Sequence, residues 1–165
     1  MKQQTFIISM IVITLAIVGG GVWALQLTDS PSAPSAATEN ARATLQEMKH
    51  DWGSVSMKDG TVTKTFTIAN EGTEPLVLSD VTTSCMCTTA QLTLGGETSP
   101  VFDMHGKSSY TMSVPPQETA ELEVIFDPAF HGPSGVGDIT RIITVRTNDA
   151  ASKELTFTLT ATVTP

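Results

Sequence analysis

The stretch Leu155-Thr156-Phe157-Thr158-Leu159-Thr160-Ala161-Thr162-Val163 places an apolar residue at every second position and a threonine at each position between them. Successive side chains of a β-strand point to opposite faces, so this stretch has one apolar face and one polar face. Threonine, valine and phenylalanine also favour strands. The pattern predicts a β-strand with one face on a hydrophobic core and the other in solvent.

Segments upstream of this stretch repeat the period of two, although Lys64 interrupts one of the apolar faces. Turns rich in glycine, proline, asparagine and aspartate separate the segments. We count about seven short strands and no convincing helix, which is typical of two packed antiparallel sheets. The sequence therefore predicts an all-β fold, an immunoglobulin-like antiparallel β-sandwich. The segments are residues 51–55, 61–69, 76–94, 119–126 and 139–147.

A different segment, Phe6 to Leu25, is a run of 20 uncharged residues. This is about the length that crosses a bilayer, and it exceeds the apolar core of a usual signal peptide. We expect one N-terminal transmembrane helix in residues 1–25 that acts as a signal anchor, with a cleaved signal peptide as the alternative. A short N-terminus with one lysine tends to stay cytoplasmic, so we expect a single-pass cell membrane protein with an extracytoplasmic domain. Cleavage would make the domain secreted.

The remaining chain divides into two parts. Residues 26–47 are rich in Ser, Pro and Ala without apolar periodicity, which indicates a flexible linker. Residues 48–165 hold the predicted strands and form the domain. The formal net charge of the chain is −8 at pH 7, and this acidic balance argues against a nucleic-acid partner.

The only two cysteines, Cys85 and Cys87, flank Met86. Their β-branched neighbours predict an extended backbone, which would project both thiols to the same side. Three outcomes stay open for this pair. The cysteines could be free and buried like small hydrophobic residues, or joined in a disulfide, which would require a local turn. They could also be half of a soft-metal site.

Six short motifs occur one after another along the chain. Together they make the sequence resemble the bacterial family called domain of unknown function 1573. The resemblance spans residues 49–163, and it implies an immunoglobulin-like sandwich that is exported or membrane-tethered and has no enzymatic activity. It also implies similarity to domains of ciliary and centrosomal scaffold proteins. The motifs are residues 51–55 (DWGSV), 66–72 (FTIANEG), 75–78 (PLVL), 84–88 (SCMCT), 126–128 (FDP) and 145–149 (VRTND).

The chain departs from the family pattern in two places that add metal-ligand types. Met86 stands where the family usually has glycine, and extra sequence between Leu94 and Pro115 brings histidine and methionine. Sulfur and imidazole groups suit Cu(I) or Zn(II). The spacing matches no compact metal motif. The candidate ligands, in the order in which we rank them, are Cys85, Cys87 and His105, then His131, with Met86, Met104 and Met112 in support.

Other chemistries are less well supported. A thiol oxidoreductase commonly has a Cys-x-x-Cys at a helix N-terminus, and neither feature is present. We expect Arg141 and Arg146 to form salt bridges with Asp127 and Asp138 at the end of the sandwich. The leading hypothesis is a membrane-tethered binding or scaffolding module without enzymatic activity, which contacts an envelope protein through loops or an open sheet edge. The alternative is an extracytoplasmic Cu(I)- or Zn-binding protein for metal handling.

Overall fold

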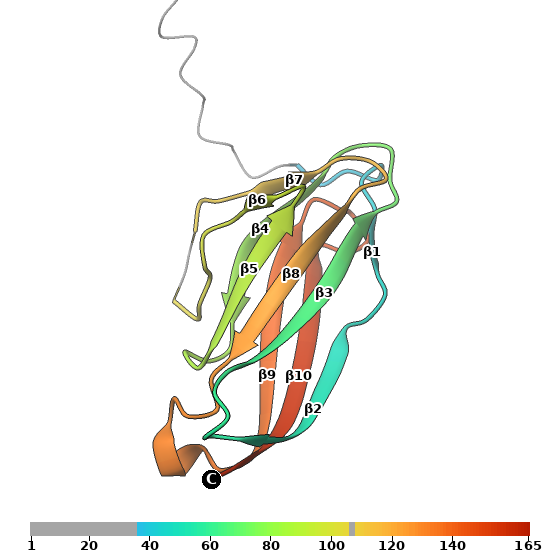
Figure 1. Ribbon diagram of the computed structural model, residues 1–165. Coiled ribbons are helices and arrows are strands. Elements are labelled where there is room, and N and C mark those ends of the chain that lie inside the picture. The colour runs from blue at the N-terminus through green and yellow to red at the C-terminus, as the bar shows by residue number, and fades with distance from the viewer. Residues whose placement is uncertain (1–35, 106–107) are drawn as a thin grey trace, which may run out of the picture. The chain divides into compact units, whose positions relative to one another are not determined.

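The computed structural model describes residues 36–105 and 108–165 of the chain. In this part of the chain, ten strands form two five-stranded sheets that pack against each other (Figure 1). The predicted all-β sandwich is therefore confirmed. A single turn of 3-10 helix, η1 (Gly132–Gly135), is the one helical segment among the described residues.

Each sheet combines long central strands with short strands at its edges. In the first sheet, the strand order is β1 (Ala43–Leu45), β3 (Val62–Asn70), β8 (Thr119–Phe126), β5 (Thr88–Leu94) and β6 (Glu97–Thr98). In the second sheet, the order is β2 (Lys49–Ser56), β10 (Glu154–Thr164), β9 (Gly137–Thr147), β4 (Leu76–Thr83) and β7 (Met112–Val114).

The structure corrects the sequence-based architecture in three respects. The described residues form ten strands and not about seven, because β1, β6 and β7 have only two or three residues and are too short to show an alternating pattern. β1 belongs to the sandwich although its composition resembles the linker, since it pairs with β3. The sandwich is also not purely antiparallel, because β2 pairs with β10 in parallel.

The core lies between the two sheets, as the alternation of β10 predicts. The apolar residues of this strand, from Leu155 to Val163, are all buried. The ring of Phe157 lies 4.8 Å from that of Phe66 on the opposite sheet. Lys64, the polar exception on β3, forms an ion pair with Glu47, and its ammonium lies over the Phe66 ring.

Asn70, at the end of β3, connects four backbone segments and is completely buried. Its side-chain amide donates hydrogen bonds to the carbonyls of Glu74 and Val114, each at 2.9 Å. Its side-chain oxygen accepts from the backbone N–H groups of Gly72 and Arg42. Every hydrogen-bonding atom of this side chain is therefore used, and β1 is held to the turn after β3.

No helix within residues 36–105 and 108–165 has the length and apolar character needed to cross a membrane. The transmembrane helix predicted for residues 1–25 lies outside the described residues.

Candidate metal centre

The two cysteines lie in the turn that carries the chain from one sheet to the other. β4 ends at Thr83 in the second sheet and β5 begins at Thr88 in the first. The Thr88 N–H donates to the Cys85 carbonyl at 3.1 Å, and the Thr83 hydroxyl donates to the carbonyls of Cys85 and Thr88. The predicted extended backbone is therefore wrong here, because the chain must change sheets over four residues.

This turn brings the two cysteine Cα atoms to 5.3 Å, and a disulfide joins Cys85 to Cys87. The separation lies inside the range that a disulfide tolerates. Of the three outcomes that the sequence leaves open, the structure has the disulfide, with the local turn that it requires. Cys87 is 3% exposed and packs with Phe126 and Val163, whereas Cys85 is only partly buried.

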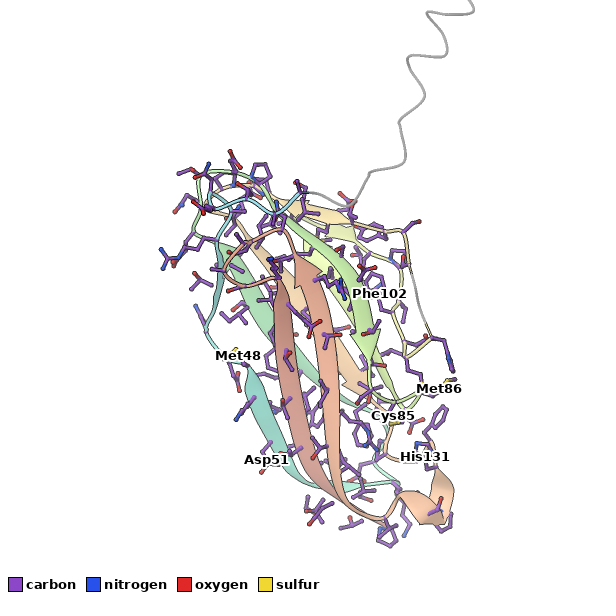
Figure 2. The ribbon with its side chains drawn as sticks, turned by 180° about the vertical axis from the view of Figure 1, so that it is seen from behind. Met48, Asp51, Cys85, Met86, Phe102 and His131 are labelled. Atoms are coloured by element: carbon purple, nitrogen blue, oxygen red, sulfur yellow. A yellow bond between two sulfur atoms is a disulfide. The ribbon has the colours of Figure 1, made fainter. Side chains whose placement is uncertain are left out.

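His131 reaches this turn from the loop between β8 and β9. The residue lies directly before the 3-10 turn, and its carbonyl accepts a hydrogen bond from the Ser134 hydroxyl at 2.7 Å. Its ring packs edge-on against Phe130. The ring nitrogen Nε2 lies 3.3 Å from the Cys85 sulfur. Figure 2 labels both residues.

Arg141 approaches the same pair of sulfurs from β9. Its Nε–H donates to the Cys87 sulfur at 3.0 Å, and its guanidinium lies over the ring of Phe126. Burial lowers the pKa of the Arg141 guanidinium, but an arginine stays charged in proteins. The cluster thus contains a fixed positive charge beside the more deeply buried cysteine.

The predicted salt bridges of the two arginines are wrong. Among the described residues, the ion pairs involve Glu47 with His50 and with Lys64, and neither Arg141 nor Arg146 takes part. The sequence does hold a signal for Arg141, because it shares the face of its strand with Ile143 and other apolar residues. A cation on such a face has to find a partner inside the fold, which here is a sulfur.

The structure brings together three of the predicted ligands. The sulfurs of Cys85 and Cys87 and a ring nitrogen of His131 all lie within 4.8 Å of one another. His105 is not in this group. It is exposed in another loop, where its backbone N–H donates to the Asp103 carboxylate.

The methionines divide between surface and core. Met86 and Met104 are both 42% exposed, and Met86 is in the cysteine turn itself. Met112 is buried in β7, opposite Leu78 of β4. Met112 is packed between the sheets and lies outside the group formed by Cys85, Cys87 and His131.

Two sulfurs and one imidazole are a soft donor set. In the disulfide form the sulfurs are held in a covalent bond, whereas reduction would give two thiolates that bind metal. A structural zinc site takes four protein ligands, and the group found among the described residues has three. Cu(I) is stable with fewer ligands and prefers thiolate, so this donor set suits Cu(I), and it also suits a zinc ion that keeps an open fourth position.

Residues 43–98 match the model of the family described as "Protein of unknown function (DUF1573)". This segment contains the first four of the six motifs, including the Cys-Met-Cys turn. The resemblance to that family is therefore confirmed over this part of the chain. No curated protein sequence matches the chain.

Among solved structures, the chain is similar to a protein of unknown function from Porphyromonas gingivalis W83. The TM-score is 0.58 at 21% identity, over 81% of this chain and 51% of that one. The chain thus spans about half the length of that protein, and the likeness shows a shared fold.

Two other similar structures are the ASH/PapD-like domain 7 of human CEP192 and the YadV chaperone. The CEP192 domain is 12% identical over 83% of this chain and 95% of that one, with a TM-score of 0.48. The YadV chaperone is 8% identical over 74% and 52%, with a TM-score of 0.46.

Proposed function

We propose that the domain binds one Cu(I) ion through Cys85, Cys87 and His131 after an external dithiol, itself oxidised to a disulfide, has reduced the Cys85–Cys87 bond to two thiols, whose protons leave as the metal binds. The observation that carries the proposal is the convergence of these three donor atoms within 4.8 Å of one another. His131 is 44 residues beyond Cys87 in the chain, and only the fold brings it to the turn. The His131 ring nitrogen lies within hydrogen-bond distance of the Cys85 sulfur, so the same atom is placed to bind a metal held by the two thiolates.

The charge of the site favours a monovalent ion. Two thiolates and a neutral imidazole around Cu(I) carry a net charge of −1, and Arg141 at the Cys87 sulfur compensates it. The same ligands around Zn(II) would be neutral, and Arg141 would then keep the Thr140 carbonyl and the Phe126 ring as partners but would face no negative charge. Because the attraction between the guanidinium and a net negative charge exists only in the Cu(I) complex, Arg141 supports Cu(I) over Zn(II).

The test is Cu(I) binding by the full chain, reduced and kept without oxygen, in competition with a chromophoric Cu(I) chelator. We expect one equivalent of copper, which is lost when both cysteines are replaced by serine while the circular dichroism spectrum is unchanged. His131→Ala should weaken binding, whereas His105→Ala is the matched control and should not. Unchanged copper content in the double-serine variant would refute the proposal.

A second candidate function is a binding or scaffolding module without enzymatic activity. It is favoured by large apolar side chains that are exposed in and next to the segments that form the sulfur cluster. Met86 lies in the cysteine turn, Phe130 precedes His131, and Ile142 follows Arg141; all three are exposed. Exposed apolar groups gathered in one region are typical of protein-binding surfaces. The uncharged segment 6–25 supports the further proposal that the module is tethered on the extracytoplasmic side of the cell membrane.

The scaffolding candidate predicts a stable partner in membranes. Affinity purification of the tagged full chain after crosslinking should recover a stoichiometric partner, which Phe130→Ser should release. Val101→Ser is a suitable control, because Val101 is also an exposed apolar residue and lies outside these segments. A chain that stays alone at native expression and holds stoichiometric metal would refute this candidate and leave the copper proposal standing.

A further inference from the structure

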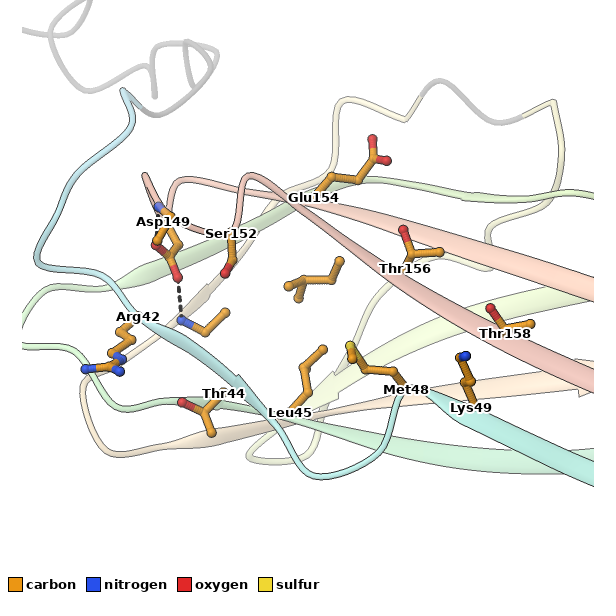
Figure 3. Close-up of a pocket in the computed structure, with 13 residues that line it drawn as sticks. Arg42, Thr44, Leu45, Met48, Lys49, Asp149, Ser152, Glu154, Thr156 and Thr158 are labelled. Carbon is orange, nitrogen blue, oxygen red and sulfur yellow. Dashed lines mark hydrogen bonds between the residues drawn. The ribbon is translucent and has the colours of Figure 1, made fainter.

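A groove of about 780 Å³ lies between β1 and the first half of β10, away from the sulfur cluster (Figure 3). Its apolar lining includes Leu45, Met48 and Leu155, and Met48 is 52% exposed. Figure 3 shows Leu45 and Met48 directed into the space between the strands. Arg42 and Lys49 contribute positively charged side chains to the lining.

The groove exists because the chain changes sheets between β1 and β2. β1 ends at Leu45 in the first sheet, and β2 begins at Lys49 in the second. β2 then pairs with β10 only from Thr158 onward. Among the described residues, the segment from Glu154 to Phe157 therefore has β9 on one side and no strand on the other.

The hydrogen-bond phase of β10 shows which backbone groups face the groove. Thr147 donates to the Lys153 carbonyl, so in this antiparallel ladder Leu155 and Phe157 direct their N–H and C=O groups to β9. Glu154 and Thr156 direct their N–H and C=O groups away from β9, toward the groove. The Thr158 N–H donates to the Met48 carbonyl at 2.8 Å, which agrees with this phase.

The opposite wall has a matching free edge. The Glu71 N–H donates to the Arg42 carbonyl, so Thr44 directs its backbone groups to β3, and Ala43 and Leu45 direct theirs to the groove. The Ala43 N–H is satisfied by the Asp149 carboxylate at 2.9 Å. The backbone groups of Leu45 have no strand partner within the described part of the chain.

We propose that this groove binds an extended peptide segment of a partner protein by β-strand addition to the free edge of β10. Free edges pair with extended chains through backbone hydrogen bonds, while pockets select alternate side chains. The apolar lining fits an apolar side chain at every second position. The free stretch from Glu154 to Phe157 has room for about four residues.

Charged side chains of both signs line the groove. Arg42 and Lys49 form no ion pair among the described residues, although the chain as a whole has a net charge of −8. The lining also contains the carboxylates of Asp149 and Glu154, so its formal charges balance and the free strand edge, not charge, determines what the groove binds. This inference concerns a surface other than the exposed apolar residues around the sulfur cluster, and it is independent of copper.

The test uses the isotope-labelled full chain and a short capped peptide that alternates valine with threonine. We expect the peptide to shift the amide resonances of Thr156 and Leu45 and to slow hydrogen exchange at Thr156. The same peptide with N-methylated amides on its pairing edge should bind at least tenfold more weakly. Met48→Glu should also weaken binding by at least tenfold, whereas the exposed Met104→Glu outside the groove should not.

Three outcomes would overturn the inference. A Thr156 amide that is already protected from exchange in the free chain would show an occupied edge. Equal binding of the normal and N-methylated peptides would show that no strand pairing occurs, and absence of any shift at millimolar peptide would exclude the site. None of these measurements depends on the copper ligands, so failure of the copper proposal leaves their result unaffected.

Discussion

The Arg141 Nε–H group lies 3.0 Å from the Cys87 sulfur and donates a hydrogen bond to it, although the two residues are 54 positions apart. Cys87 is the more buried of the two cysteines, so water has little access to its sulfur and competes weakly with Arg141 for it. A hydrogen bond from a charged donor is stronger than one between neutral groups, more so when it is shielded from water. The Cys87 sulfur is neutral in the disulfide; under the proposed function, in which the disulfide is reduced, Arg141 would stabilise the charge of the Cys87 thiolate.

The first prediction concerns this arginine. Arg141→Met removes the charge and the hydrogen bond while keeping an apolar stem, and it should weaken Cu(I) binding about tenfold, or ~1.4 kcal/mol. The measurement is the chelator competition described above. Arg146→Met, an exposed arginine on the same strand, is the control and should bind copper like the wild type. Equal affinity in both variants would show that Arg141 acts only in packing.

The second prediction tests the core. Phe157 is fully buried at the middle of β10 and packs on the Phe66 ring. Phe157→Ala should lower the free energy of unfolding by ~3 to 5 kcal/mol, because it removes apolar contacts and leaves a cavity. Urea denaturation measures the change. The outward-facing Thr156→Ala should change it by less than ~0.5 kcal/mol. A loss below ~1 kcal/mol in Phe157→Ala would contradict the assigned faces.

The third prediction concerns Asn70. Asn70→Ala leaves the buried carbonyl of Val114 and the N–H of Gly72 without the partners they have in the fold. Each unsatisfied buried group costs about 1–3 kcal/mol, so we expect a loss of roughly 3 kcal/mol in denaturant titrations. Asn40→Ala is the control, since Asn40 is exposed, and it should lose less than ~1 kcal/mol. Similar losses in both variants would contradict the role of Asn70.

The fourth prediction concerns acid sensitivity. Glu74 accepts hydrogen bonds from the Thr38 hydroxyl and the Asn40 amide, which hold its pKa below the ordinary value of 4.5. A lowered carboxyl pKa stabilises the fold above the unfolded-state pKa, and the contribution is lost as the pH falls through the folded-state pKa. The wild type should therefore lose more stability than Glu74→Gln when the pH falls from about 6 to about 3. Parallel stability curves for the two proteins would contradict this linkage.

The sequence predicts the sandwich well because long strands with one buried face must alternate. β10 and β8 are the clearest cases, since their inward residues are buried and their intervening residues are mostly exposed. β1 escapes detection because three residues carry too little pattern, and its pairing depends on the distant Asn70. The parallel pairing of β2 with β10 also has no local signature, since it depends on the arrangement of the whole sheet.

The candidate site is only partly predictable for a related reason. The sequence alone shows the two cysteines as candidate ligands, because they are the only cysteines and lie two residues apart. Both histidines are also possible ligands by their chemistry. Sequence spacing ranks His105 above His131, but the structure brings His131 to the sulfurs and leaves His105 elsewhere. Whether a histidine lies near the cysteines depends on which loops meet at one end of the sandwich. The turn itself is also not predicted, because the β-branched residues around the cysteines are typical of a strand. These residues favour a strand, but the chain has to cross from one sheet to the other at this point and therefore forms a turn.

The parallel pairing of β2 with β10 also determines when the domain can form. β2 begins at Lys49, and its partner residues run from Thr158 to Thr164. A ribosome has therefore made almost the whole domain before β2 can find its place, and closing so long a chain makes folding slow. During synthesis the nascent chain presents unpaired strands for which β10 is not yet available, and this is the interval in which it is most exposed to aggregation.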